Sequence, residues 1–343
     1  MFETIRQEVA LVESRVVGVF RYRDVFQLRP VPEQAPTLAS VPGHHPCLLE
    51  FKYAVREVAE TPLNPEVPRI QSMIDFDDSK KRRREVLLLL STFCKSRVFQ
   101  YETGGTATQQ WFVSLPKGPG DTAGVGKLYW GVEGYGFEGC NRIIESFSES
   151  EEPPISKVDR NKYFSSDHPG QWIVGETSGT FEMPDNIQGL LDCYYDLPEE
   201  ARKPYLSSCF LLCKGIELAR SAPSLAFAAC ASAIETLSAF DHREEKSKKC
   251  PECHQDLYNV GKKFREFIET NGPSPGYEKF AKKIYKRRSE ILHSGQLTFG
   301  EVEPWTTEKS IDALSDADFR RKVISFFRIC LINWLAKTHT RKT

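Results

Sequence analysis

The sequence has no excess of either charge, because 46 Lys and Arg residues are balanced by 47 Asp and Glu residues. This balance excludes a chain that binds nucleic acid as a polycation over its whole surface. No apolar run approaches the roughly 20 residues that span a bilayer, and residues 1–8 lack the basic and then apolar order of a secretion signal. We therefore expect a cytoplasmic protein with no membrane partner.

Cysteine is also scarce, since ten residues in a chain of 343 are too few for a disulfide scaffold. Several lie in apolar stretches, where a free thiol packs as a small hydrophobe. The run Cys250-Pro251-Glu252-Cys253-His254 is the exception and looks like a zinc knuckle, because C-x2-C lets two thiolates hold one tetrahedral ion. It supplies half a site, which His254, the nearby His242 or cysteines elsewhere would complete. The zinc would be structural, and no catalytic metal is expected.

Short strand-like segments dominate the first part of the chain and predict a β-rich sensor or regulatory domain over residues 1–150. The segments are 16–22, 25–28, 49–55, 97–101, 111–115 and 127–130. One helix is expected at 80–94, opened by Asp78 or Ser79 as its cap. Polar, proline-containing sequence then begins an irregular linker over residues 151–185.

Long helical patterns fill residues 186–343 and predict an all-α domain. The expected helices are 198–221, 224–240, 259–270, 277–294 and 316–338. This part carries 25 Lys and Arg against 21 Asp and Glu, whereas the part before it carries 21 against 26. We therefore expect an α+β fold of two domains, with the positive surface on the helical one.

A charged residue interrupts the apolar stripe of the expected helix 277–294. The helical period places Arg288 in line with Ile284 and Ile291, and a guanidinium there must be paired or face a cleft. Gly295 favours the helix end, so His293 lies in the last turn with Ser289 as its i,i+4 neighbour. Arginine and histidine side chains therefore converge where this helix ends.

This pairing suits cleavage of an RNA phosphodiester. A histidine can move a proton at neutral pH, and a guanidinium can hold a phosphate oxygen while negative charge builds up. The RNA 2′-hydroxyl supplies the nucleophile, so the reaction needs no metal. From spacing alone a structural alternative stays open, in which Arg288 pairs with a carboxylate and His293 caps its helix.

Glu235 is the only charged residue between Ser224 and Phe240. A lone carboxylate on so apolar a helix demands a partner when it is buried. The alternative is that Glu235 lies on a solvent-facing strip.

The run Tyr285-x-x-Arg288-Ser289-x-x-x-His293-x-Gly295 resembles the R-x4-6-H signature of HEPN domains. The Cys-x-x-Cys segment between the second long helix and this motif helix is similar to that of the ApeA-like subgroup. The resemblance covers roughly residues 186–340. It implies a helical bundle that acts as a metal-independent endoribonuclease, whose active site forms where two motif helices meet across a homodimer.

The resemblance also implies roles for single residues and for the whole protein. Arg288 and His293 would be catalytic, and Ser289 would be the supporting polar residue. Glu235 would complete the site as the partner of Arg288, because HEPN domains pack these two helices together. Lys283, Lys286 and Arg287 on the same helix are the expected RNA-binding residues. Many family members act as toxins or in defence against phage. Single-stranded or unpaired RNA is the expected substrate, because the in-line geometry of the reaction is hard to reach inside an A-form helix.

Two other functions stay open. One is a non-catalytic HEPN module that uses the same helix to bind a nucleotide or a protein partner. The other is a zinc-stabilised nucleic-acid adaptor that depends on the knuckle and on the basic run Lys80–Arg84. That run would lie at a helix N-terminus, where the macrodipole disfavours cations, so it either contacts nucleic acid or is a solvated helix start beside Asp75, Asp77 and Asp78.

Overall fold

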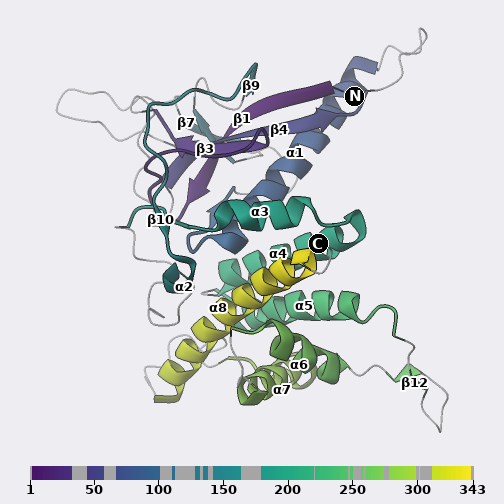
Figure 1. Cartoon of the computed structure of the whole chain (residues 1–343). Helices are drawn as coiled ribbons and strands as arrows, with labels where there is room; N and C mark the ends of the chain where they lie inside the picture. The colour runs from purple at the N-terminus through teal and green to yellow at the C-terminus, as the bar shows by residue number, and fades with distance from the viewer. Residues whose placement is uncertain are drawn as a thin grey trace. The chain divides into compact units, whose positions relative to one another are not determined.

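The computed structural model divides into two compact units, residues 1–158 with 174–184, and residues 159–173 with 185–343. The described residues are 2–32, 45–57, 67–100, 110–112, 128–131, 134–137, 142–163, 179–219, 221–245, 248–249, 256–257, 260–273, 278–298, 301 and 311–340. The expected α+β composition is confirmed, with an antiparallel sheet toward the N-terminus and most helices toward the C-terminus (Figure 1). Residues 151–185, expected to be a linker, contribute to both units.

The main sheet of the first unit is antiparallel, and its strands follow the order β2-β3-β4-β1-β5, with β9 also pairing with β1. These strands are β1 (Phe2–Val12), β2 (Phe20–Tyr22), β3 (Phe26–Pro30), β4 (His45–Val55), β5 (Val98–Phe99) and β9 (Arg142–Ile144). A second sheet holds β6 (Gln110–Phe112), β7 (Leu128–Gly131) and β8 (Gly134–Phe137), and β10 (Lys157–Val158) pairs with β11 (Met183–Pro184). Helix α1 (Val67–Phe93) packs against β4.

The central strand β1 was not expected, because it does not have the alternation of a half-buried strand. Its Gln7 and Glu8 are buried. Gln7 donates to Glu50 Oε1 at 2.9 Å, and Glu8 Oε2 lies 2.7 Å from Arg83 Nη1, with both side chains only 5% exposed. These polar groups are satisfied inside the unit by partners distant in sequence.

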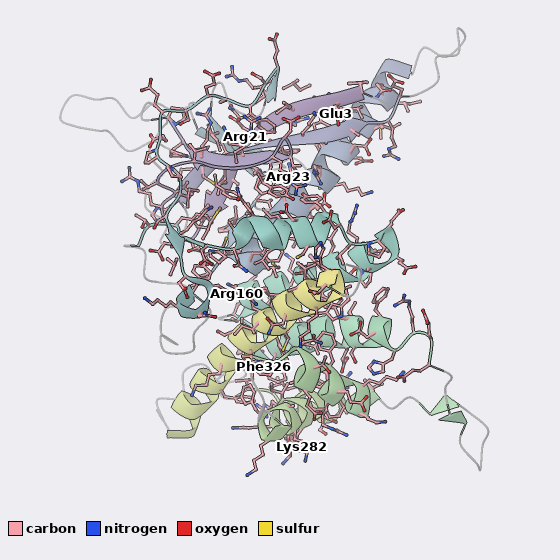
Figure 2. All side chains as sticks on the ribbon, viewed as in Figure 1. Glu3, Arg21, Arg23, Arg160, Lys282 and Phe326 are labelled. Atoms are coloured by element: carbon pink, nitrogen blue, oxygen red, sulfur yellow. The ribbon has the colours of Figure 1, made fainter. Side chains whose placement is uncertain are left out.

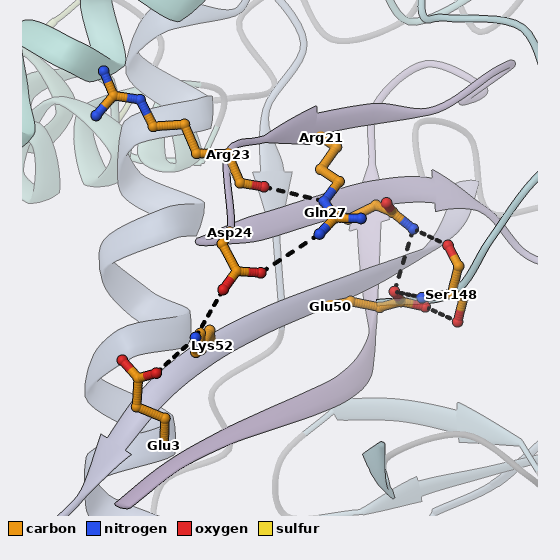
Figure 3. A network of polar contacts seen from close by, with 8 residues as sticks. All are labelled: Glu3, Arg21, Arg23, Asp24, Gln27, Glu50, Lys52 and Ser148. Atoms are coloured by element: carbon orange, nitrogen blue, oxygen red, sulfur yellow. Dashed lines mark hydrogen bonds and ion pairs between the residues drawn. The ribbon is translucent and has the colours of Figure 1, made fainter. Parts of the chain in front are cut away.

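Glu50 is the most connected of these buried groups (Figure 3). Its side chain is 0% exposed and its Oε1 lies 2.9 Å from Arg29 Nε. It also accepts hydrogen bonds from Gln7 and Gln27 and from both the backbone N–H and the hydroxyl of Ser148. A single carboxylate therefore joins β1, β3, β4 and the segment that follows β9.

The prediction for the start of α1 was wrong, since the helix begins at Val67 and not near residue 80. Asp78 is no helix cap: it lies 2.7 Å from Arg56, and the hydrogen bonds from that guanidinium lower the pKa of its carboxyl. The basic run Lys80–Arg84 consequently lies in the helix interior. The expectation that it forms a helix N-terminus is corrected.

The second unit is a bundle of helices around α5 (Figure 1). Its longer helices are α3 (Ile187–Tyr195), α4 (Glu199–Leu218), α5 (Pro223–Asp241), α6 (Val260–Asn271), α7 (Glu278–Ser294) and α8 (Ile311–Thr340). The five expected helices correspond to α4 to α8, and α8 begins five residues earlier than expected. Helix α3 and the short α2 (Arg160–Tyr163) were not predicted. Neither were the strands β12 (Lys248–Lys249) and β13 (Asp256–Leu257), which make this unit not purely helical.

Helix α5 packs against α4, α6, α7 and α8. It is the one described helix that is long and apolar enough to cross a membrane by length and composition. In the structure 61% of its most apolar window is buried inside the protein. Its apolar side chains thus form the centre of the bundle, among them Ile234 and Leu237.

The described cysteines are free, and most are buried, as expected for small apolar residues. Burial raises the pKa of Cys230 to about 12, so its thiol stays protonated at neutral pH. It lies at the crossing of α4 and α5, where a Cβ added to Gly215 would collide with the Cys230 sulfur and lie 2.9 Å from the carbonyl oxygen of Ala226.

Replacement of Gly215 and of Gly189 by alanine is predicted to change the free energy of unfolding in opposite directions. Gly215→Ala is expected to lower the free energy of unfolding, since overpacking of a fixed contact costs about 1–3 kcal/mol. Gly189→Ala in α3 meets nothing within 4 Å and is expected to raise that free energy by about 0.5–1 kcal/mol through helix propensity. Chemical denaturation of both variants tests this, and changes of the same sign would contradict the packing.

Candidate functional site

The C-terminal end of α7 positions the expected catalytic residues. Ile284 and Ile291 are buried, while the Arg288 side chain between them on the helix is 16% exposed. Gly295 has φ +63°, a left-handed conformation that suits glycine after a helix. His293 therefore lies in the last turn, as predicted, and its side chain is exposed.

Arg288 is paired with Glu235 across the contact between α7 and α5. Its Nε lies 2.9 Å from Glu235 Oε1, and its Nη2 donates to Oε2 at 3.1 Å. The two side chains are 16% and 19% exposed, so this is a two-point ion pair at the edge of the core. The expected partner of the lone carboxylate is confirmed, and the alternative of a solvent-facing strip is wrong.

The other side of the same guanidinium meets His293. Arg288 Nη1 lies 2.9 Å from His293 Nε2. Because a guanidinium can only donate, a hydrogen bond between these two atoms requires Nε2 to be the acceptor. One arginine thus joins a carboxylate on α5 to a histidine at the end of α7.

The chain after α7 is tied back to the start of α5. Ser224 Oγ accepts a hydrogen bond from the Thr298 backbone N–H at 2.8 Å, and the Ser224 N–H donates to the Glu301 carboxylate at 3.2 Å. A carboxylate at this helix N-terminus also interacts favourably with the positive end of the helix macrodipole. This connection, which the sequence did not reveal, fixes the turn that follows His293.

The remaining expected site residues have different surroundings. Ser289 is half-buried and makes no side-chain hydrogen bond with any described residue. Lys283 Nζ lies 4.4 Å from the ring centre of Phe319. Arg287 is 23% exposed and lies 3.5 Å from Glu290, whereas Lys286 is 79% exposed with only a 3.7 Å contact to Glu290. Lys286 is thus far more accessible than Arg287.

The expected zinc residues Cys250, Cys253 and His254 lie outside the described residues. The flanking β12 and β13 form an antiparallel pair, so the chain enters and leaves this segment side by side. The described residues contain no group of three or more His, Cys, Asp or Glu side chains that could hold a metal. His242, considered as a further ligand, has its Nδ1 2.8 Å from the Ser238 carbonyl oxygen and its Nε2 3.5 Å from Glu266.

A cavity of about 390 Å³ lies near His242 in the helical unit. Four carboxylates line it, those of Glu200, Asp241, Glu245 and Glu266, together with the guanidinium of Arg243. This excess of negative charge disfavours a nucleic-acid backbone. The cavity therefore does not compete with the α7 end as a site for RNA.

The basic run of the first unit is largely engaged within that unit. Arg83 is buried against Glu8, Arg82 pairs with Glu85, and Lys80 lies 5.9 Å from the ring centre of Phe76. These contacts remove the basis for a nucleic-acid site made of five free cations.

Comparison of the chain with protein-family models, with curated proteins and with solved structures found no match. The function is therefore argued from the chemistry of the site itself.

Proposed function

We propose that the helical unit is a metal-independent endoribonuclease of the HEPN type, which cuts single-stranded or unpaired cytoplasmic RNA in phage defence or as a toxin. The observation that carries this proposal is the Glu235–Arg288–His293 arrangement, in which one guanidinium contacts a carboxylate and an imidazole. Arg288 and His293 are the catalytic pair that the resemblance implies. Glu235 is the third group, and it orients the guanidinium.

The proposed reaction is an in-line displacement at phosphorus. The 2′-oxygen forms a bond to phosphorus, the bond to the 5′-oxygen breaks, and a 2′,3′-cyclic phosphate results. His293 takes the proton from the 2′-hydroxyl or gives one to the departing 5′-oxygen. Arg288 stabilises the negative charge on the phosphoryl oxygens, and Glu235 keeps its guanidinium in place.

The contact between Arg288 and His293 describes the site before substrate binds. The lone pair of His293 Nε2 is directed at Arg288 Nη1. A phosphate oxygen is a stronger acceptor for a guanidinium than a neutral imidazole is. Substrate binding would therefore transfer Nη1 to the phosphate and free Nε2 to move a proton.

A second copy of the chain would complete the site. One histidine supplies either the proton acceptor or the donor at a given moment, and a twofold axis doubles both groups. Leu292 and Leu297, on either side of His293 in the sequence, are 45% and 47% exposed. These apolar side chains support a homodimer through the end of α7.

The direct test mixes purified protein with a single-stranded RNA in the presence of a chelator. We expect a dimer by light scattering, cleavage that persists without magnesium, products with 2′,3′-cyclic phosphate ends, and no cleavage of DNA of the same sequence. Cleavage that requires added magnesium, or activity from a strict monomer at micromolar concentration, would contradict the proposal.

One observation favours the non-catalytic alternative. Arg288 uses Nε, Nη1 and Nη2 within the protein, as a purely structural arginine does. Such a module would bind a nucleotide or partner without cutting RNA, and activated protein that leaves every RNA intact would select it.

Zinc at Cys250, Cys253 and His254 stays a prediction, and we assign it a structural role. Thiolate and imidazole ligands suit this metal, and it would fix the turn between β12 and β13. The zinc-stabilised adaptor is less well supported, because two of the cations it would use at Lys80–Arg84, Arg82 and Arg83, are paired within the first unit.

A further inference from the structure

We infer that Lys279, Lys282 and Lys286 form a row that binds the RNA backbone on one side of the cleaved phosphate. This inference rests on the proposed function for its substrate and adds a surface that the resemblance does not supply. It keeps Lys286 from the expected set and replaces Lys283 and Arg287 by two other lysines.

The row follows from the helical period of α7. Steps of three and four residues stay on one face of a helix, and Lys279, Lys282, Lys286, Ser289 and His293 are separated by steps of three, four, three and four. The three lysines therefore share a face with His293. Arg288 lies on the opposite, core-facing side and reaches His293 only with the end of its guanidinium.

The charges of the row are available to a ligand. All three lysines are exposed, and Figure 2 shows Lys282 on the outer side of α7. Lys279 and Lys282 have no ion pair with a described residue, and Lys286 has only its long contact to Glu290. Lys283 lies against Phe319 and Arg287 lies beside Glu290, both off the row.

The chemistry of this row fits a polyanion with regularly spaced charges. Lysine is a flexible point charge that binds phosphates without reading bases. The lysines extend from His293 toward the start of α7 only, so they contact the strand on one flank of the cleaved bond. Single-stranded DNA offers the same phosphates without the 2′-hydroxyl, and it should bind to the row without being cut.

The test compares the full-length protein with the triple variant Lys279→Gln, Lys282→Gln and Lys286→Gln. Glutamine keeps helix propensity while it removes the charge. The matched control changes Lys214, Lys262 and Lys263 to Gln, which removes the same charge from helices α4 and α6. Fluorescence anisotropy with single-stranded DNA measures binding without turnover, and RNA cleavage gives kcat and KM.

Loss of three phosphate contacts should weaken DNA binding about 10- to 100-fold at 0.1 M salt and reduce the slope of log K against log salt by about 2. The KM for RNA should rise with kcat nearly unchanged, and the control should match wild type. Equal binding of DNA by the triple variant and the control, or no DNA binding by wild type, would overturn the proposal that this row binds the nucleic-acid backbone. Row-dependent DNA binding without any RNA cleavage would support the row and contradict the proposed function.

Discussion

Replacement of His293 by Ala is expected to lower the rate of RNA cleavage by about 10²–10⁴-fold, because the reaction then lacks its positioned proton-transfer group. The side chain is exposed at the end of α7, so the fold should be unaffected. RNA binding should also persist, since it depends on charges that the substitution leaves in place. Single-turnover cleavage and thermal melting, measured on the same preparations, test both expectations.

Two further variants separate the roles within the site. Arg288→Ala should abolish cleavage as well, but it also leaves the half-buried Glu235 carboxylate without its partner, so some loss of stability accompanies it. Glu235→Gln keeps the shape and removes the charge that holds the guanidinium. Its expected effect is a lower kcat with less change in KM, since Glu235 acts through Arg288 and not on the substrate. Full cleavage by His293→Ala or Arg288→Ala would show the catalytic assignment to be wrong.

Replacement of Glu50 by Ala is expected to lower the free energy of unfolding of the first unit by about 3–5 kcal/mol. The substitution leaves the Arg29 guanidinium and several buried donors without the carboxylate that now accepts from all of them. Chemical denaturation gives the change in stability, and hydrogen exchange of the amides in β1, β3 and β4 assigns it to this unit.

Figure 3 shows a matched control on the same sheet, because Glu3 contacts Lys52, which also contacts Asp24. The Glu3 side chain is 66% exposed, and exposed ion pairs contribute little. Glu3→Ala should therefore change the unfolding free energy far less than Glu50→Ala. Glu50→Gln, which keeps the volume, should give an intermediate loss if the alanine variant does not fold. Equal stability of the Glu3 and Glu50 variants would contradict the buried role of Glu50.

Local patterns in the chain were enough to predict the long helices of the second unit. They also placed Arg288 and His293 together near the end of one helix. The apolar period of α4 and α7 extends over several turns, and α5 is almost uniformly apolar; both patterns are properties of neighbouring residues. Burial of a lone charge predicted that Glu235 needs a partner, but its pairing with Arg288 was expected only through the resemblance to HEPN domains, which pack these two helices together. Gly295 marked the helix end that fixes His293.

Tertiary contacts decided which polar and charged side chains are buried, because their partners lie far away in the sequence. The middle of strand β1 reads as polar, yet Gln7 and Glu8 are buried because Glu50 and Arg83 satisfy them. Likewise, the run Lys80–Arg84 has the composition of a solvated or nucleic-acid-binding surface, and only the packing of α1 turns Arg83 inward. Composition reports the charge of a side chain, whereas its availability to a ligand is set by which groups the fold brings within hydrogen-bonding distance.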